Sequence, residues 1–325
     1  FRKGAFDPRI GFVKIFDLLK VKPLFNVPSS VFFARKDLKT KYPVKAIIYS
    51  GELPSKNEGL REAEKCLTMR ETNLKLGAIG ERSFLTEKVL RIPKMQSDYY
   101  KKIYQGATIV PRQIWFVDIT PHPKFGINLQ MPYVKTSERA KRLAKEAYKD
   151  LSFEGIVEPQ FLFSLLTGSE IVPFGILKSP IIVVPVEPTN TKYRLIDSEE
   201  AGARGFLNLK KWLNQAELEW KKRREEKAEK MTIYERLDRQ MGLSKQNPRA
   251  KYKVIYNTSG TYLASAIVEN KKPIVKVNGT KVQLNGILID CTLYSYETNS
   301  KDEAFYIASI LNSSIIDEAI KPAQA

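Results

Sequence analysis

Residues 22–36 read Lys-Pro-Leu-Phe-Asn-Val-Pro-Ser-Ser-Val-Phe-Phe-Ala-Arg-Lys, and this stretch sets the expected fold at the start of the chain. Proline fixes its own φ angle and has no N–H, so the segment between Pro23 and Pro28 is expected to form a stiff elbow. The short apolar run that follows predicts a buried strand from Ser30 to Ala34, ended by a basic pair. We therefore expect a sheet to begin close to the first residue.

The charge of the chain predicts a polyanionic partner. Its 325 residues carry 54 Lys and Arg against 36 Asp and Glu, a formal net charge of +18. Such a surplus points to nucleic acid first and to an anionic membrane second. The alternative is a protein rich in Lys and Glu whose charge is incidental. The surplus is concentrated in residues 1–50, where eleven basic residues face only Asp7, Asp17 and Asp37.

The composition argues against several classes of protein. The two cysteines, Cys66 and Cys291, lie far apart in sequence, and His122 is the single histidine. This pattern predicts neither a disulfide framework nor a zinc site, and it suits a reducing cytoplasm. No apolar run approaches the roughly 20 residues of a membrane span. The chain begins with Phe rather than Met, which predicts a fragment or a missing start.

Periodicity and turn residues predict a mixed α+β chain long enough for more than one domain. The expected helices cover 57–76, 97–105, 136–150 with Ser137 as N-cap, 208–242 and 302–320. The expected strands cover 29–36, 42–49, 107–119, 171–187, 252–256, 262–268, 273–277 and 287–296, while 10–20 fits either a helix or a strand. Turns are expected at Ser259-Gly260 and at Asn278-Gly279. The charged middle of the 208–242 helix predicts a solvated arm or spacer.

Several catalytic motifs are missing from the sequence. There is no Gly-x-Gly, so neither a dinucleotide fingerprint nor a phosphate loop is expected. There is also no Pro-Pro pair. The Glu269-Asn270-Lys271 stretch resembles half of a metal-dependent nuclease site, but no Asp lies between Asp238 and Asp290 to complete it.

Three stretches together resemble the N6-adenine-specific DNA methyltransferases of restriction-modification systems. Residues 22–36 resemble a late strand of the catalytic domain, Gly106 to Val117 is similar to a segment of the target-recognition region, and 302–325 look like the closing helix with its Leu-Asn-Ser turn. The resemblance implies three regions. Residues 1–50 would be the C-terminal strands of a Rossmann-like, mainly parallel catalytic sheet. Residues 51–205 would be a target-recognition module, and 206–325 a long helix, a β-rich recognition module and the closing helix.

The resemblance also implies what the chain lacks and what it binds. The Asn-Pro-Pro-aromatic catalytic motif and the S-adenosylmethionine motifs of the family would precede this chain. We therefore expect no cofactor and no methylation by this chain alone, and S-adenosylmethionine in the intact enzyme. The expected partners are double-stranded DNA and the missing N-terminal catalytic region, in cis or in trans. Because an adenine must leave the duplex to be methylated, the family stacks it on an aromatic residue, matched here by Phe25. The alternative is that Phe25 fills the core beside Leu24.

Most protein–DNA contacts are made to phosphates, and bidentate side chains read bases. The candidate phosphate contacts are Lys101, Lys102, Arg112, Arg139, Lys141 and Arg142. Gln113 and Asn257 have the chemistry of base readers. The stretch Tyr256-Asn257-Thr258-Ser259-Gly260 is expected as a polar hairpin tip that probes a groove. The alternatives are solvated surface charges and an ordinary turn.

Three functions follow from these observations. The first is the sequence-specific DNA-recognition part of an N6-adenine DNA methyltransferase. The second is a stand-alone DNA-binding specificity subunit without methylation activity in cis. The third is a structural or interaction protein with an incidental charge, which predicts no DNA binding at modest salt.

Overall fold

The computed structural model describes residues 9–25, 29–79, 82–87, 97–260 and 262–320. The chain is a mixed α+β protein, as expected. Its contacts divide it into two compact units: unit 1 contains Phe1–Gln96 and Ile315–Ala325, and unit 2 contains Ser97–Ser314. The division after Gln96 differs from the boundaries expected after residues 50 and 205.

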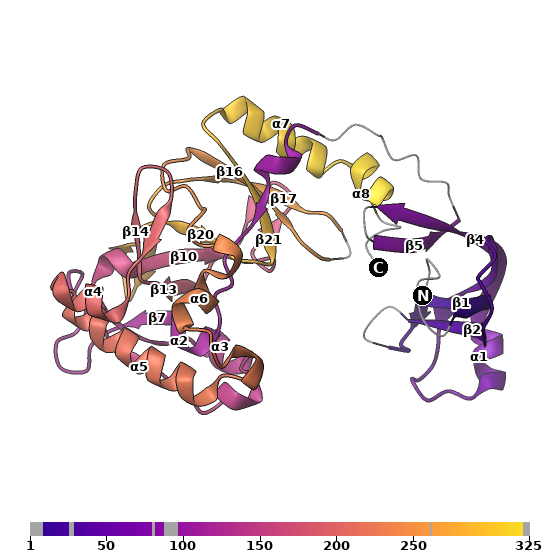
Figure 1. Ribbon diagram of the computed structural model, residues 1–325, viewed down its shortest axis with the longest axis horizontal. Helices are drawn as coiled ribbons and strands as arrows, with labels where there is room; N and C mark the ends of the chain where they lie inside the picture. The colour runs from indigo at the N-terminus through magenta and orange to yellow at the C-terminus, as the bar shows by residue number, and fades with distance from the viewer. Residues whose placement is uncertain (1–8, 26–28, 80–81, 88–96, 261, 321–325) are drawn as a thin grey trace. The chain divides into compact units, whose positions relative to one another are not determined.

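Unit 1 is built on one five-stranded sheet of order β2-β1-β3-β4-β5 (Figure 1). The strands are β1 (Ile10–Lys22), β2 (Ser30–Lys36), β3 (Val44–Glu52), β4 (Leu67–Ile79) and β5 (Arg82–Thr86). Strands β1 and β3 run parallel, whereas β1·β2, β3·β4 and β4·β5 are antiparallel. The described sheet is therefore mainly antiparallel, and the expectation of a mainly parallel sheet was wrong for it.

Residues 30–36 form the expected strand, β2, but this strand is not buried. All seven residues of β2 are exposed, including Val31, Phe32 and Phe33. Strand β2 is the edge of the sheet, and the small core of unit 1 instead lies around Ile15 and Val44. The prediction of a buried strand from Ser30 to Ala34 was therefore wrong, because an apolar run alone does not say which faces are covered.

The segment 57–76, expected as one helix, is in large part a strand. Helix α1 covers only Leu60–Cys66, and β4 begins at Leu67. Strand β4 pairs with β3 over eight residue pairs, from Val44↔Leu74 to Gly51↔Leu67. Backbone pairing with a neighbouring strand overrides the helix preference of the local sequence.

Unit 2 contains two larger sheets. A six-stranded sheet has the order β20-β10-β13-β7-β8-β9, with β7 (Phe116–Thr120), β8 (Tyr133–Thr136), β9 (Glu154–Ile156), β10 (Leu162–Leu166), β13 (Ile181–Val183) and β20 (Ile287–Ile289). A four-stranded sheet has the order β17-β16-β21-β6, with β6 (Tyr104–Gln105), β16 (Tyr252–Asn257), β17 (Ser265–Glu269) and β21 (Leu293–Thr298). Because β20 pairs with β10, the segments on either side of the expected boundary at 205 share one sheet.

Three two-stranded hairpins complete the strands of unit 2. They are β11 (Ile171–Val172) with β12 (Gly175–Ile176), β14 (Val186–Pro188) with β15 (Tyr193–Leu195), and β18 (Ile274–Val277) with β19 (Thr280–Gln283). Asn278 and Gly279 connect β18 to β19 with φ angles of 46° and 82°. Two positive φ angles are what the expected two-residue turn requires, so that prediction is confirmed.

The helices of unit 2 cover the faces of these sheets. They are α2 (Arg112–Trp115), α3 (Glu138–Arg142), α4 (Ser198–Ala203), α5 (Leu207–Arg223), α6 (Ile233–Leu237) and α7 (Lys301–Leu311). Helix α8 (Ser314–Ile320) belongs, apart from Ser314, to unit 1. The short 3-10 helices are η1 (Tyr100–Lys102), η2 (Glu146–Tyr148), η3 (Pro159–Phe161), η4 (Glu226–Ala228) and η5 (Arg239–Met241). Helix α5 contributes Trp212, Leu213 and Ala216 to the main core, together with residues of the six-stranded sheet. Helix α7 packs on the four-stranded sheet through Ala304 and Ile307.

Several expected helices are shorter than predicted. Ser137 caps α3 as expected, since its Oγ accepts a hydrogen bond from the Ala140 N–H at 3.2 Å, but the helix ends at Arg142. The closing helix is interrupted after Leu311, where the Asn312 side chain hydrogen-bonds both the N–H and the C=O of Ser265. No helix among the described residues is long and apolar enough to cross a membrane.

Candidate nucleic-acid interface

A break in the expected 208–242 helix forms part of the wall of a cavity in unit 2. Helix α5 ends at Arg223, and Arg224 is extended. The chain then turns back, so that Trp220 Nε1 donates to the Met231 carbonyl at 2.8 Å. Thr232 starts α6 with a capping box, in which its side chain and that of Glu235 each bond the other residue's backbone N–H. The charged stretch after Arg223 therefore turns back as a loop, called the returning loop, and forms one wall of the cavity. The prediction of one continuous helical arm over 208–242 was wrong.

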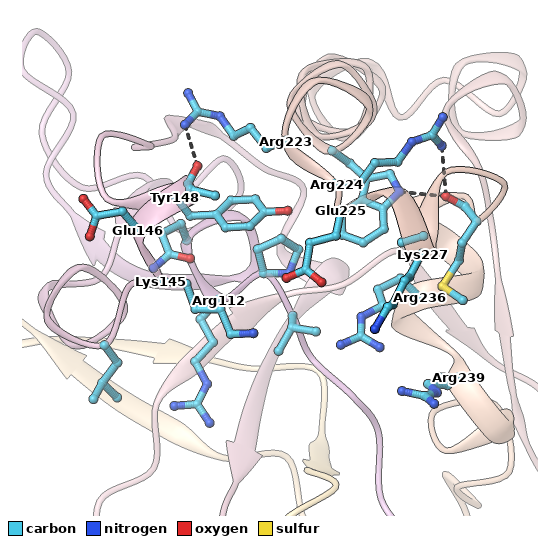
Figure 2. Close-up of a pocket in the computed structure, with 18 residues that line it drawn as sticks. Arg112, Lys145, Glu146, Tyr148, Arg223, Arg224, Glu225, Lys227, Arg236 and Arg239 are labelled. Atoms are coloured by element: carbon cyan, nitrogen blue, oxygen red, sulfur yellow. Dashed lines mark hydrogen bonds between the residues drawn. The ribbon is translucent and has the colours of Figure 1, made fainter.

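This cavity, called the basic pocket below, has a volume of about 860 Å³ (Figure 2). It lies between the α2–α3 region, the C-terminal end of α5 and the α6–η5 region. Its charged lining consists of seven basic residues, Arg112, Lys145, Arg223, Arg224, Lys227, Arg236 and Arg239, and two acidic ones, Glu146 and Glu225. The pocket therefore has a strongly positive character.

Two of the seven basic residues have structural partners. Arg223 donates to both carboxylate oxygens of Asp150 and to Glu219, and these acids raise the pKa of its guanidinium further above its ordinary value. Arg224 Nη1 donates to the Met231 carbonyl at 3.2 Å. In Figure 2 these two side chains bond backbone carbonyls beside the cavity. They hold the returning loop in place.

The remaining basic groups are available to a ligand. Within the described residues, no carboxylate forms an ion pair with Arg112, Arg236 or Arg239, nor with Lys145 or Lys227. Arg112 and Arg236 are half-buried, and the Arg112 guanidinium lies 5.4 Å from the centre of the Phe116 ring. A guanidinium offers a planar fork of donors that matches phosphate oxygens, and its attraction is stronger where water is partly excluded. The pocket can therefore neutralise phosphate groups.

The expected base reader beside Arg112 has a structural role. Gln113 lies at the rim of the basic pocket, but it is only 3% exposed, and its Nε2 donates to the Ala140 carbonyl at 2.9 Å. This bond ties α2 to α3. The Gln113 amide thus already has a buried partner in this arrangement, and base reading by Gln113 stays a prediction.

Helix α3 carries three of the expected phosphate contacts, Arg139, Lys141 and Arg142, and they differ in their partners within the protein. Arg139 Nη1 bonds the buried Glu170 carboxylate at 2.6 Å. Lys141 forms an exposed ion pair with Glu138 at 2.7 Å, and Arg142 is exposed. Exposed i,i+3 pairs contribute little, so Lys141 and Arg142 remain candidates. The expected contacts Lys101 and Lys102 are exposed on η1 and do not line the basic pocket.

Several described side chains of the expected groove-probing tip have partners within the protein. Tyr256 packs against Tyr294 with ring centres 5.3 Å apart, and burial raises the pKa of Tyr256 to about 12. The Asn257 amide bonds the carbonyls of Ser259 and Tyr262 and accepts from the Ala264 N–H, so it closes the loop. Thr258 bonds the Thr292 carbonyl, and Ser259 is exposed. The Asn257 amide is thus occupied by bonds within the loop, and base reading by Asn257 stays a prediction, as do the roles of Tyr256, Thr258 and Ser259.

Phe25 of unit 1 is 63% exposed. The alternative that it fills a core beside Leu24 therefore does not hold, and its stacking on a base stays a prediction. Residues 26–28, which follow it in the elbow, lie outside the described residues.

Sequence reasoning missed most of the basic pocket. It interpreted 221–230 as the solvated middle of a helical arm or spacer and did not single out Lys145, Arg236 or Arg239. One signal was available: Thr232 and Glu235 have the spacing of a capping box, which marks a new helix start. No protein-family model matches the chain, and a search of curated proteins finds no match.

Proposed function

We propose that this chain is the DNA-recognition part of an N6-adenine DNA methyltransferase. The observation that carries the proposal is the basic pocket, in which Arg112, Arg236 and Arg239 form no ion pair with a carboxylate of the described residues. Unpaired guanidinium groups on a chain of net charge +18 favour a polyanion. The methyltransferase assignment rests on the sequence resemblance of residues 22–36, 106–117 and 302–325.

The expected role of the pocket is to position the duplex through its phosphates. Such contacts supply much of the affinity without reading sequence, and each one releases counterions. Sequence reading would then come from the exposed loops of unit 2, including the β16–β17 tip at Thr258 and Ser259. In the intact enzyme, S-adenosylmethionine would supply the methyl group from a region for which this chain carries no motif.

The first experiment measures binding of the full chain to a random-sequence duplex by fluorescence anisotropy across a salt series. The double variant Arg236→Gln and Arg239→Gln is expected to bind more weakly. Its slope of log affinity against log salt should be shallower by about 2, because each lost phosphate contact reduces the slope by about 1.

The matched control is the double variant Lys192→Gln and Lys211→Gln. Both lysines are exposed in unit 2, and the change in net charge is identical. Lys211 also lies about 18 Å from Arg223 along the axis of α5, at a rise of about 1.5 Å per residue. Equal slopes for the two double variants would contradict a specific role for the pocket, and no binding at low salt would refute DNA binding.

A separate experiment tests the methyltransferase assignment. Disrupting the gene in its source cell should remove N6-methyladenine from one recurring sequence motif of the genome. Retention of methylation at every motif would contradict the assignment, and DNA binding without any change in methylation would favour the stand-alone specificity subunit.

A further inference from the structure

We propose that Phe174 is a wedge residue that inserts into the base stack of duplex DNA at a position that a base has left. This inference rests on the proposed function and deepens it, because it names the group that holds the duplex open. Phe174 lies at the tip of the β11–β12 hairpin in unit 2, and its side chain is 58% exposed.

The backbone at this tip holds an unusual residue. The strand pairs Ile171↔Ile176 and Val172↔Gly175 leave Pro173 and Phe174 as the two turn residues. Phe174 has a φ of 58°, in the left-handed region that favours glycine or asparagine at the second central position of a turn. For a bulky residue this conformation is strained, and strained exposed residues gather at binding sites.

The hairpin is anchored firmly despite its exposed tip. The Phe174 N–H donates to the Ser265 carbonyl at 2.8 Å, and the Leu177 N–H donates to the Glu170 carbonyl at 2.7 Å. The Glu170 side chain is buried and accepts from Arg139 at 2.6 Å and from the Thr167 N–H at 2.9 Å. The ring of Phe174 is thus presented on a rigid support, which lowers the entropy lost on insertion.

The position of the hairpin connects it with the other DNA candidates. Ser265, which holds the Phe174 N–H, is the strand partner of Tyr256 at the expected groove-probing tip. Arg139, at the base of the hairpin, belongs to α3, and α3 is tied by the Gln113–Ala140 bond to the rim of the basic pocket. The exposed aromatic ring at the tip matches a base stack, whereas the phosphate contacts would come from the unpaired guanidinium groups of the basic pocket.

The tip is apolar over more than one residue. Val172, Ile176 and Leu177 are also exposed, and the exposed Lys178 follows them. Proteins that kink or open a duplex insert apolar wedges of this type between base steps, and the wedge restores part of the lost stacking. Stacking of an aromatic side chain on a base is sequence-tolerant, since every base has a π-face.

The experiment compares binding of the full chain to two duplexes that differ only in a central abasic site. We expect tighter binding to the abasic duplex by roughly tenfold, because the gap removes the penalty of unstacking a base. Phe174→Gly should abolish this preference and keep the binding to the intact duplex. The same variant should raise Tm by about 2–4 °C, since glycine relieves the strained φ.

The matched control is Phe125→Ala, because Phe125 is 75% exposed on the β7–β8 loop of the same unit. This control should keep the preference for the abasic duplex. Equal binding of the two duplexes by the wild-type chain would overturn the wedge role of Phe174 but not DNA binding. A preference of the Phe174→Gly variant for the abasic duplex would do the same. A lowered Tm or an altered oligomeric state in Phe174→Gly would mean instead that the ring packs against protein. Absence of binding to either duplex would overturn the proposed function and the wedge with it.

Discussion

Gln246 pairs through both ends of its side-chain amide with the backbone of Ile289. Its Nε2 donates to the Ile289 carbonyl at 2.9 Å, and its Oε1 accepts from the Ile289 N–H at 2.9 Å. The same Nε2 donates to the Gly242 carbonyl at 2.9 Å. Gln246 is fully buried and thus fastens β20 to the end of the α6–η5 segment, which forms one wall of the basic pocket.

Gln246→Leu should destabilise unit 2 by about 3 kcal/mol, because it leaves buried backbone groups without partners. Urea unfolding followed by tryptophan fluorescence measures this, since all three tryptophans lie in unit 2. Gln283→Leu, at an exposed position of β19, is the control and should change stability by about 0.5 kcal/mol or less. Equal effects of the two changes would contradict the role given to Gln246.

Gly106→Ala should destabilise unit 2 by about 3 kcal/mol through a backbone clash. A Cβ at position 106 would lie 2.3 Å from the Ile289 oxygen and 2.5 Å from the Asp290 oxygen. Gly155→Ala is the control, because a Cβ there meets nothing within 4 Å. Thermal unfolding of both variants is the measurement, and a Gly106→Ala variant as stable as Gly155→Ala would refute the close approach.

Arg139→Met should destabilise the protein by about 3 kcal/mol, since it leaves the buried Glu170 carboxylate without its cation. If this ion pair is structural, adding Glu170→Gln to the same chain should recover much of the loss. A double-mutant cycle in urea unfolding tests the coupling. Additive effects of the two changes would show that the pair is not coupled, and Arg139 would then be free to contact DNA.

The stability contribution of Asp290 should depend on pH. Burial raises the pKa of Asp290, while hydrogen bonds from Thr292 and the charge of Arg112 oppose the rise. A folded state with the higher pKa binds the proton more readily than the unfolded state. The contribution of Asp290 is therefore fully present below its ordinary pKa of 3.8 and is lost as pH rises through the folded-state pKa.

Asp290→Asn keeps an oxygen acceptor for Thr292 and cannot ionise. Its Tm relative to the wild type should therefore be higher at neutral pH than in acid. Thermal unfolding of both proteins across that pH range is the measurement. A Tm difference that does not change with pH, or that changes in the opposite direction, would refute the prediction.

Features that depend on neighbouring residues were readable from the sequence. Ser137 caps α3 and Asn278-Gly279 turns between β18 and β19 because caps and tight turns are decided within a few residues of chain. The interruption at Arg224 could also have been read, because the capping box at Thr232 and Glu235 is local. It was missed because the apolar spacing continues across the break.

The sequence by itself determined the mixed α+β class, the local caps and turns, and the strong positive charge. Only the tertiary structure decided that β4 is a strand, that Gln113 is buried, and that Arg112 and Arg236 share one pocket. The physical reason is the sequence separation of the interacting residues. Strand pairing, burial and the gathering of charges depend on contacts between residues far apart in the chain. Helix propensity and charge patterning act over a few residues and contain no information on those contacts.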